Sequence, residues 1–231
     1  MSEHLLRVCA VRRATSSTRV LRLEGTFPYL AGQAAELAPV ESAGSSPYSI
    51  ASAPDDTAAH GYVEFLIKVD AHERWGEQFE PLRRGQDIRV HGPLGRFTFP
   101  DQTLERNFLF IAGGTGIAPL RAMVRHARAV RHPGSYRLLY SARTPDDFAY
   151  LPELRGMARR GELRFMATAT RGGDERWKGG RGRIAAAQLA LLIDDPATLC
   201  FVCGPAAMVD DVPAMLGELG IDRSRIRLEE W

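Results

Sequence analysis

The sequence predicts two domains of different fold class, an antiparallel β-barrel followed by an α/β domain with a parallel sheet. The chain has 231 residues, which is enough for two domains of about 100 to 130 residues each. Residues 1–100 contain short strand-like segments separated by turns, as in antiparallel barrels. Residues 101–231 alternate between strand and helix patterns, which is typical of a parallel sheet covered by helices. The pattern changes near Pro100–Arg106, so we expect the domain boundary after residue 100.

Six segments of the first hundred residues have the alternation, or the β-branched and aromatic content, of strands. They are Leu5–Arg12, Thr18–Leu23, Ala34–Pro39, Tyr48–Ala51, Tyr62–Val69 and Asp87–Val90. Turn-forming residues separate them at Ala31–Gln33, Ser42–Pro47 and Pro54–Asp56. One short helix is expected over Trp75–Leu82.

The second part of the chain alternates strictly between the two patterns. Strands are expected at Asn107–Ala112, Tyr136–Tyr140, Leu163–Ala169, Thr198–Val202 and Arg225–Glu229. Helices are expected at Pro119–Val130, Leu151–Ala158, Ala185–Leu192 and Ala206–Leu219. The first of these helices has an apolar face made of Leu120, Met123, Val124, Ala127 and Val130.

Composition excludes several classes of protein. A hydrophobic fraction of 45% and a charged fraction of 25% are ordinary for a globular protein. A net charge of +2 is too small to indicate nucleic-acid binding. No apolar stretch approaches the ~20 residues of a membrane helix, and no signal peptide is evident, so a cytoplasmic location without membrane attachment is expected.

Cysteine and histidine usage indicates no metal centre. Three cysteines provide neither a disulfide framework nor an iron–sulfur ligand set. Cys200 and Cys203 have C-x-x-C spacing, so a redox pair remains an alternative. The six histidines show no ligand-like clustering, and we expect no bound metal.

The most specific local motif is FLFIAGGTGIAP at Phe108–Pro119, in which a predicted strand is followed by a glycine turn and then by a predicted helix. Such a turn lets backbone N–H groups approach a pyrophosphate at the positive end of a helix. Pro119 suits the first helical turn and stands where the usual dinucleotide fingerprint has its third glycine. The motif favours a phosphate site over a merely structural turn.

Two later strand ends carry a hydroxyl and an arginine rather than an acidic residue. Ser141-Ala142-Arg143 follows one strand, and Thr170-Arg171 follows the next. An acidic residue at such a position binds an unmodified ribose, whereas arginine suits a 2′-phosphate. The sequence therefore favours NADP(H) over NAD(H), the alternative being that Arg143 and Arg171 are solvated surface residues.

A strand at Pro47–Ser52 carries an aromatic ring followed by a hydroxyl group. The ring of Tyr48 can cover a flat heterocycle, and the hydroxyl of Ser49 can bond to a ring nitrogen. Alone, the segment is better explained as an ordinary strand.

Several motifs occur together in a characteristic order. They are Ala31–Gln33, Pro47–Ser49, Gly92–Phe97, Gly113–Pro119, Cys203–Pro205 with Met208, and Glu229–Trp231. Over nearly its whole length the chain resembles the ferredoxin–NADP reductase superfamily. The resemblance implies an FAD-binding barrel over residues 1–100 and an NAD(P)-binding α/β domain over residues 101–231, with the flavin at their junction and no attached iron–sulfur domain.

The resemblance also implies roles for individual residues. Contacts to FAD are expected from Pro47, Tyr48, Ser49, Ile50, Ile67, Lys68, Val69, Gly76 and Trp231. Contacts to the nicotinamide dinucleotide are expected from Gly114, Thr115, Gly116, Pro119, Ser141, Arg143, Thr170, Arg171, Gly204, Pro205 and Met208. Ser49, Cys203 and either Glu229 or Glu230 are expected around the path of the hydride.

Two positions depart from the family pattern. Ser46 stands where the family usually has an arginine that grips the flavin phosphate, and Gly76 stands where it usually has a hydroxyl residue. One lost charged hydrogen bond costs about 1.5–3 kcal/mol, or roughly one to two decades of affinity. We therefore expect weak retention of FAD.

The resemblance implies a flavin-dependent enzyme that takes a hydride from NAD(P)H and passes electrons to a separate acceptor. The acceptor expected is a ferredoxin, a flavodoxin or an oxygenase component. One alternative is a reductase of free flavin or another small acceptor, whose turnover depends on added flavin. An alternative of another class is a nucleotide-binding or regulatory subunit that transfers no hydride.

Overall fold

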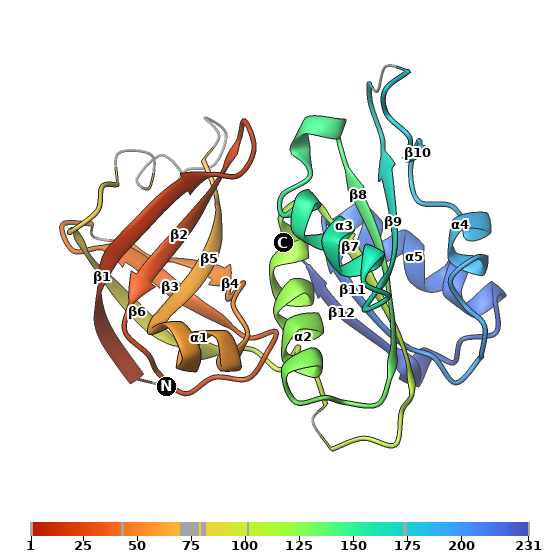
Figure 1. The fold of residues 1–231 in the computed structure, drawn as a ribbon, viewed down its shortest axis with the longest axis horizontal. Coiled ribbons are helices and arrows are strands. Elements are labelled where there is room, and N and C mark those ends of the chain that lie inside the picture. The colour runs from red at the N-terminus through yellow and green to blue at the C-terminus, as the bar shows by residue number, and fades with distance from the viewer. Residues whose placement is uncertain are drawn as a thin grey trace. The chain divides into compact units, whose positions relative to one another are not determined.

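The computed structural model describes residues 2–42, 44–69, 79, 82–100, 102–172 and 175–230. The chain divides by its internal contacts into two compact units (Figure 1). Met1–Phe99 with Arg121–Val130 forms the first, here called the barrel unit. Pro100–Leu120 with Arg131–Trp231 forms the second, here called the α/β unit.

The barrel unit contains a six-stranded sheet in the order β4-β3-β6-β1-β2-β5, in which every neighbouring pair is antiparallel. Its strands are β1 (Ser2–Arg13), β2 (Thr18–Glu24), β3 (Ala34–Pro39), β4 (Ser46–Ser49), β5 (Tyr62–Lys68) and β6 (Asp87–Leu94). A bridge between Ile50 and Phe65 brings the two edge strands together, so the sheet is nearly closed. The predicted antiparallel barrel is confirmed.

Alternating apolar residues fill the inside of this barrel. Val63, Phe65 and Ile67 on β5 pack with Leu21 and Leu23 on β2. This is the period of two that a half-buried strand requires. The opposite face of β5 carries Glu64, which is nevertheless 2% exposed.

A helix stands where the sequence indicated only a turn. Pro54–Asp56, expected as turn residues, form the first turn of α1 (Pro54–His60). Proline in the first turn loses no helical hydrogen bond, and Asp56 accepts a hydrogen bond from the Ala53 N–H at 3.1 Å. A helix of this length is too short to show the 3.6-residue apolar period. The helix expected over Trp75–Leu82 lies almost entirely outside the described residues.

The α/β unit is built on a six-stranded parallel sheet in the order β10-β9-β8-β7-β11-β12. Its strands are β7 (Asn107–Gly113), β8 (Ser135–Ala142), β9 (Arg164–Ala169), β10 (Gly180–Arg181), β11 (Leu199–Gly204) and β12 (Ile226–Glu230). The predicted parallel sheet is confirmed. β10 was not expected, because two residues are too few to form a pattern.

Helices follow the strands of this sheet as the sequence predicted (Figure 1). They are α2 (Ile117–Ala129), α3 (Leu151–Arg159), α4 (Ala186–Ala190) and α5 (Ala206–Glu218). α2 ends before Val130, which is 46% exposed, so the expectation that Val130 belongs to its apolar face was wrong. Among the described residues, no helix is long and apolar enough to cross a membrane.

The order of the parallel strands indicates a ligand-binding position at the carboxyl ends of the central strands. The chain runs outward from β7 through β8 and β9 to β10, and then returns to the other side of β7 as β11 and β12. In open α/β sheets, ligands bind beyond the carboxyl ends of the strands where the strand order reverses. That position lies between the loops that follow β7 and β11.

Candidate functional site

The glycine loop directly follows β7. Gly114–Gly116 forms one turn of 3₁₀ helix, and α2 begins at Ile117. Gly114 has φ +55°, a left-handed conformation that costs other residues energy, and a Cβ there would meet nothing within 4 Å. At Gly116 a Cβ would overlap the carbonyl oxygen of Cys203, so only glycine allows the glycine loop to pack against the end of β11.

This loop has the properties of an anion site. Gly114 is exposed, Thr115 is half-buried, and both precede a helix of 13 residues. The first N–H groups of a helix have no partner within it, and the helix dipole favours negative charge there. Pro119 is the third residue of α2, in the first turn as the sequence predicted.

The loop after β11 lies on the other side of the place where the strand order reverses, here called the switch point. Gly204 ends β11, Pro205 is the N-cap of α5, and Met208 lies in the first turn of that helix. The buried Cys203 thiol donates a hydrogen bond to Glu229 Oε2 at 3.8 Å. Cys203 and Glu229 are also direct partners in the β11–β12 pairing.

The alternative of a Cys200–Cys203 redox pair is not supported. All three cysteines of the chain are free. Residues three apart on one strand point to opposite faces of the sheet, which separates the two thiols. Burial raises the pKa of Cys200 to about 12, so its reactive thiolate form is suppressed.

Two arginines lie together at the carboxyl end of the sheet. The Arg171 N–H donates to the Arg143 carbonyl at 2.6 Å, and the Thr170 N–H donates to the Ala142 carbonyl at 2.9 Å. Both arginines are exposed, and Ser141 is half-buried on β8. The structure therefore brings the two hydroxyl–arginine segments side by side.

In the barrel unit, the expected flavin residues lie on the two edge strands. Tyr48 and Ser49 are on β4, and Lys68 is on β5, on the same side of the Ile50–Phe65 bridge. The half-buried Tyr48 ring packs edge-on against Phe79, with 5.4 Å between ring centroids. Pro47 is exposed at the start of this segment.

The other expected flavin residues differ in accessibility. Ile67 is 1% exposed and packs in the barrel core, whereas Val69 is half-buried after the end of β5. Ser46, at the position of the family's arginine, is buried on β4 opposite Leu37. Gly76 and Trp231 lie outside the described residues.

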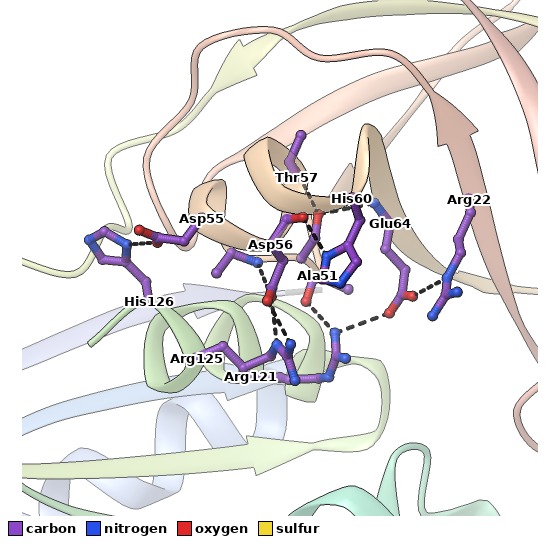
Figure 2. Close-up of polar contacts among 12 residues, drawn as sticks. Arg22, Ala51, Asp55, Asp56, Thr57, His60, Glu64, Arg121, Arg125 and His126 are labelled. Atoms are coloured by element: carbon purple, nitrogen blue, oxygen red, sulfur yellow. Dashed lines mark hydrogen bonds and ion pairs between the residues drawn. The ribbon is translucent and has the colours of Figure 1, made fainter. Parts of the chain in front are cut away.

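The end of the β4 segment is held by a buried ion pair that sequence reasoning missed. Arg121 Nη1 donates to the Ala51 carbonyl at 2.6 Å and to Glu64 Oε1 at 3.0 Å (Figure 2). Glu64 Oε2 also accepts from Arg22 Nε at 2.7 Å. The backbone two residues after Ser49 is thus fixed by α2.

Two further pairs join α2 to α1 in the same view. Arg125 forms a two-pronged contact with Asp56, at 2.5 and 2.6 Å, and His126 Nδ1 lies 2.5 Å from Asp55 Oδ2 (Figure 2). Burial acts to raise the pKa of Asp56, but hydrogen bonds and charge from Arg125 outweigh it and lower the pKa overall. No local signal could have revealed these pairs, because their partners are far apart in the sequence.

Hydroxyl groups inside the barrel unit also contact the backbone that follows β4, where the Tyr29 hydroxyl donates to the Ser52 carbonyl at 3.1 Å. The Tyr29 hydroxyl lies 2.7 Å from Thr57 Oγ1 and 3.0 Å from Ser52 Oγ, which accepts from the Glu64 N–H at 3.0 Å. Burial raises the pKa of Tyr29 to about 12, so the hydroxyl stays neutral at physiological pH.

Comparison with known families identifies both parts of the chain. The Oxidoreductase FAD-binding domain model matches residues 10–99. The Oxidoreductase NAD-binding domain model matches residues 110–213. The two matches have the same order as the barrel and the parallel sheet.

Individual relatives agree with these matches. Ferredoxin–NADP reductase B of Sorangium cellulosum is 34% identical over 192 residues, which are 80% of this chain and 77% of that protein. The glycine betaine monooxygenase reductase subunit of Chromohalobacter salexigens is 32% identical, over 80% of this chain and 50% of its own length. The solved structure of the ferredoxin reductase in carbazole 1,9a-dioxygenase has a TM-score of 0.85 at 25% identity, covering 99% of this chain and 69% of that one.

The fold, the glycine loop and these relatives define a flavin- and nicotinamide-dependent oxidoreductase. The chain belongs to the ferredoxin–NADP reductase family. It is an FAD-dependent NAD(P)H reductase.

Proposed function

We propose that this reductase uses NADPH in preference to NADH and passes electrons from FAD to a separate acceptor protein. The observation that carries the NADPH preference is the pair of exposed arginines, Arg143 and Arg171, joined by a backbone hydrogen bond of 2.6 Å. A ferredoxin, a flavodoxin or an oxygenase component is the acceptor proposed. The names of a ferredoxin–NADP reductase and of a monooxygenase reductase subunit among the relatives support this choice.

The chemistry at the two strand ends suits a phosphate group. Guanidinium groups form planar two-pronged contacts with phosphate oxygens, and Ser141 and Thr170 add hydroxyl donors. The exposed Arg143 and Arg171 therefore offer positive charge to a 2′-phosphate.

The barrel unit has residues that fit a flavin. Bound FAD supplies the group that accepts a hydride and releases electrons singly. We assign the contact with its ring to Tyr48, whose half-buried aromatic face suits a flat heterocycle. We assign the orientation of the ring to Ser49, and its border to Pro47 on β4 and to Ile50, which directly follows that strand. Ile67 and Lys68 on β5, and Val69 directly after it, contribute from the other edge strand.

In the α/β unit, Gly114, Thr115 and Gly116 hold the pyrophosphate of the dinucleotide. We assign Cys203, Gly204, Pro205 and Met208 to the nicotinamide end, because the loop after β11 meets the glycine loop. The hydrogen bond between the Cys203 thiol and Glu229 keeps a proton beside that end.

The preference for NADPH is tested by stopped-flow measurement of flavin bleaching under anaerobic conditions. Wild-type protein should favour NADPH over NADH by about tenfold or more in kcat/KM, since one charged hydrogen bond supplies that factor. The double variant Arg143→Ala, Arg171→Ala should lose the preference through a raised KM for NADPH. A wild type that favours NADH, or a double variant with an unchanged ratio, would contradict the proposal.

A reductase of free flavin is the second candidate, and Ser46 favours it. This serine is buried and uncharged where the family has an arginine. Turnover that needs added flavin but no acceptor protein would support this candidate. Rapid reduction of a ferredoxin, a flavodoxin or an oxygenase component by FAD-loaded protein would support the first.

A further inference from the structure

A buried tyrosine hydroxyl contacts the glycine loop from behind. Tyr140 on β8 is 0% exposed, and its hydroxyl donates to the Gly114 carbonyl at 3.0 Å. The same oxygen accepts a hydrogen bond from the Ala149 N–H, and burial raises the pKa of Tyr140. The hydroxyl therefore remains protonated and acts as a donor toward the loop.

The surroundings of Tyr140 leave its ring little freedom. β8 lies between β7 and β9, where Tyr140 pairs with Ala112 and Ala167. Its ring meets Phe148 edge-on at 4.9 Å between centroids, and Phe148 stacks on Trp177 at 5.1 Å. A ring packed in this way sets the position of its hydroxyl.

The bond to Gly114 controls the direction of the next N–H group. The Gly114 carbonyl also accepts from the Ile117 N–H, so two donors hold it. Because a trans peptide is planar, the carbonyl and the following N–H point in opposite directions. With the carbonyl turned toward Tyr140, the Thr115 N–H points away from Tyr140, and Gly114 beside it is exposed.

We propose that Tyr140 is a positioning residue for the dinucleotide, and this rests on the proposed role of the glycine loop in holding the pyrophosphate. Its hydroxyl fixes the Gly114–Thr115 peptide so that the Thr115 N–H faces the ligand. Its bond to Ala149 connects the loop to the segment that follows Arg143, the residue assigned to the 2′-phosphate. One buried hydroxyl thus contacts both the glycine loop and the chain that follows Arg143.

The chain contains a matched control on the same strand. Tyr136 is also buried on β8, and its hydroxyl donates to the His132 carbonyl at 2.9 Å, at the opposite end of the strand. Tyr140→Phe and Tyr136→Phe each remove one buried hydroxyl that donates to a backbone carbonyl. Only the first removes a contact with the glycine loop.

The test is calorimetric titration of FAD-loaded protein with NADP⁺ and, separately, with NAD⁺. Tyr140→Phe should bind both dinucleotides about three- to tenfold more weakly, since a neutral hydrogen bond supplies up to that factor. The KM for NADPH should rise while kcat stays within about twofold, as for a loss of uniform binding. Tyr136→Phe should keep wild-type values for both. Phe148→Leu, which loosens the ring but keeps the hydroxyl, should weaken binding in the same direction if Tyr140→Phe does not fold.

Unchanged dinucleotide affinity in Tyr140→Phe, or an equal loss in Tyr136→Phe, would overturn the positioning role. Failure of the proposed function would give different experimental results from failure of the positioning role. Wild-type protein that binds NADP⁺ but transfers no hydride overturns the reductase assignment and leaves the Tyr140 comparison valid. Wild-type protein that binds neither dinucleotide overturns both.

Discussion

At the scale of single residues, the barrel unit depends on a carboxylate buried between two arginines. Glu64 is 2% exposed and contacts Arg22 and Arg121 with different oxygens. Removing a charge from water is costly, and the cost is offset only when the geometry and the hydrogen bonds are complete. Here both carboxylate oxygens have a guanidinium partner, and Arg121 also satisfies the Ala51 carbonyl.

Replacement of this carboxylate should therefore destabilise the protein strongly. Glu64→Gln leaves two arginines without a counter-charge, and the free energy of unfolding should fall by about 3–5 kcal/mol in urea denaturation. The control is Asp87→Asn, which removes the half-buried partner of the exposed Arg7 and should change stability little. Equal effects of the two variants would show that the buried ion pair contributes no more than a surface pair.

The Arg125–Asp56 pair makes the free energy of unfolding depend on pH in the acidic range. The pKa of Asp56 is lower in the folded protein than its ordinary 3.8, so the carboxylate contributes stability above that value. The contribution disappears as the pH falls through the lower, folded-state pKa. Asp56→Asn should be less stable than wild type at neutral pH, and the difference in urea midpoint should shrink toward zero in strong acid. A difference that is constant with pH would argue against this linkage.

At the scale of elements, the turn from β7 into α2 combines two separate requirements for glycine. Gly114 needs glycine for its left-handed φ, whereas Gly116 needs it because the Cys203 carbonyl occupies the space of a Cβ. The first requirement concerns local backbone energy. The second concerns the packing of the glycine loop against the end of β11, at the point where the strand order of the sheet reverses.

These requirements predict different outcomes for alanine. Gly114→Ala should lose about 1–2 kcal/mol of stability, the cost of a left-handed residue, and remain folded. Gly116→Ala should lose more stability, because the glycine loop and the backbone of Cys203 must move apart to make room for the Cβ. The displaced loop should also bind the dinucleotide more weakly. Gly217→Ala in α5, where a Cβ meets nothing within 4 Å, should gain about 0.5–1 kcal/mol. A Gly116→Ala protein as stable as Gly114→Ala would contradict the packing argument.

At the scale of the whole molecule, the residues assigned to the two cofactors lie in two different folds. The antiparallel barrel carries the residues assigned to FAD, and the switch point of the parallel sheet carries those assigned to the dinucleotide. The buried Ser46 supplies no charge for the flavin phosphate, so we expect FAD to be bound more weakly than in relatives that have an arginine at this position.

Purified protein should consequently contain less than one FAD per chain. Its visible absorbance should increase on addition of FAD, and gel filtration should remove part of the flavin again. The loss of one charged contact corresponds to a dissociation constant raised by about one to two decades. Stoichiometric FAD that survives gel filtration would show that other residues replace the missing arginine.

Most of the fold, and the strand–turn–helix form of the glycine loop in the candidate site, could be predicted from the sequence, because their signals are local. Period-two segments indicated the barrel strands, and alternating strand and helix patterns indicated the parallel sheet. The glycine loop was recognisable because its residues are contiguous and lie between a strand and a helix. By contrast, α1 and β10 were missed, since short elements contain too few residues to show a period.

The sequence by itself determined the two fold classes, the order of the longer strands and helices, the family and the two expected cofactors, because motifs and periodicity are local properties of the chain. Only the tertiary structure decided which distant residues meet. The bond from Tyr140 to Gly114, the pairing of Arg121 with Glu64 and the adjacency of Arg143 and Arg171 join different elements. The physical reason is that such contacts depend on sheet order and helix packing, which fix distances between residues far apart along the chain.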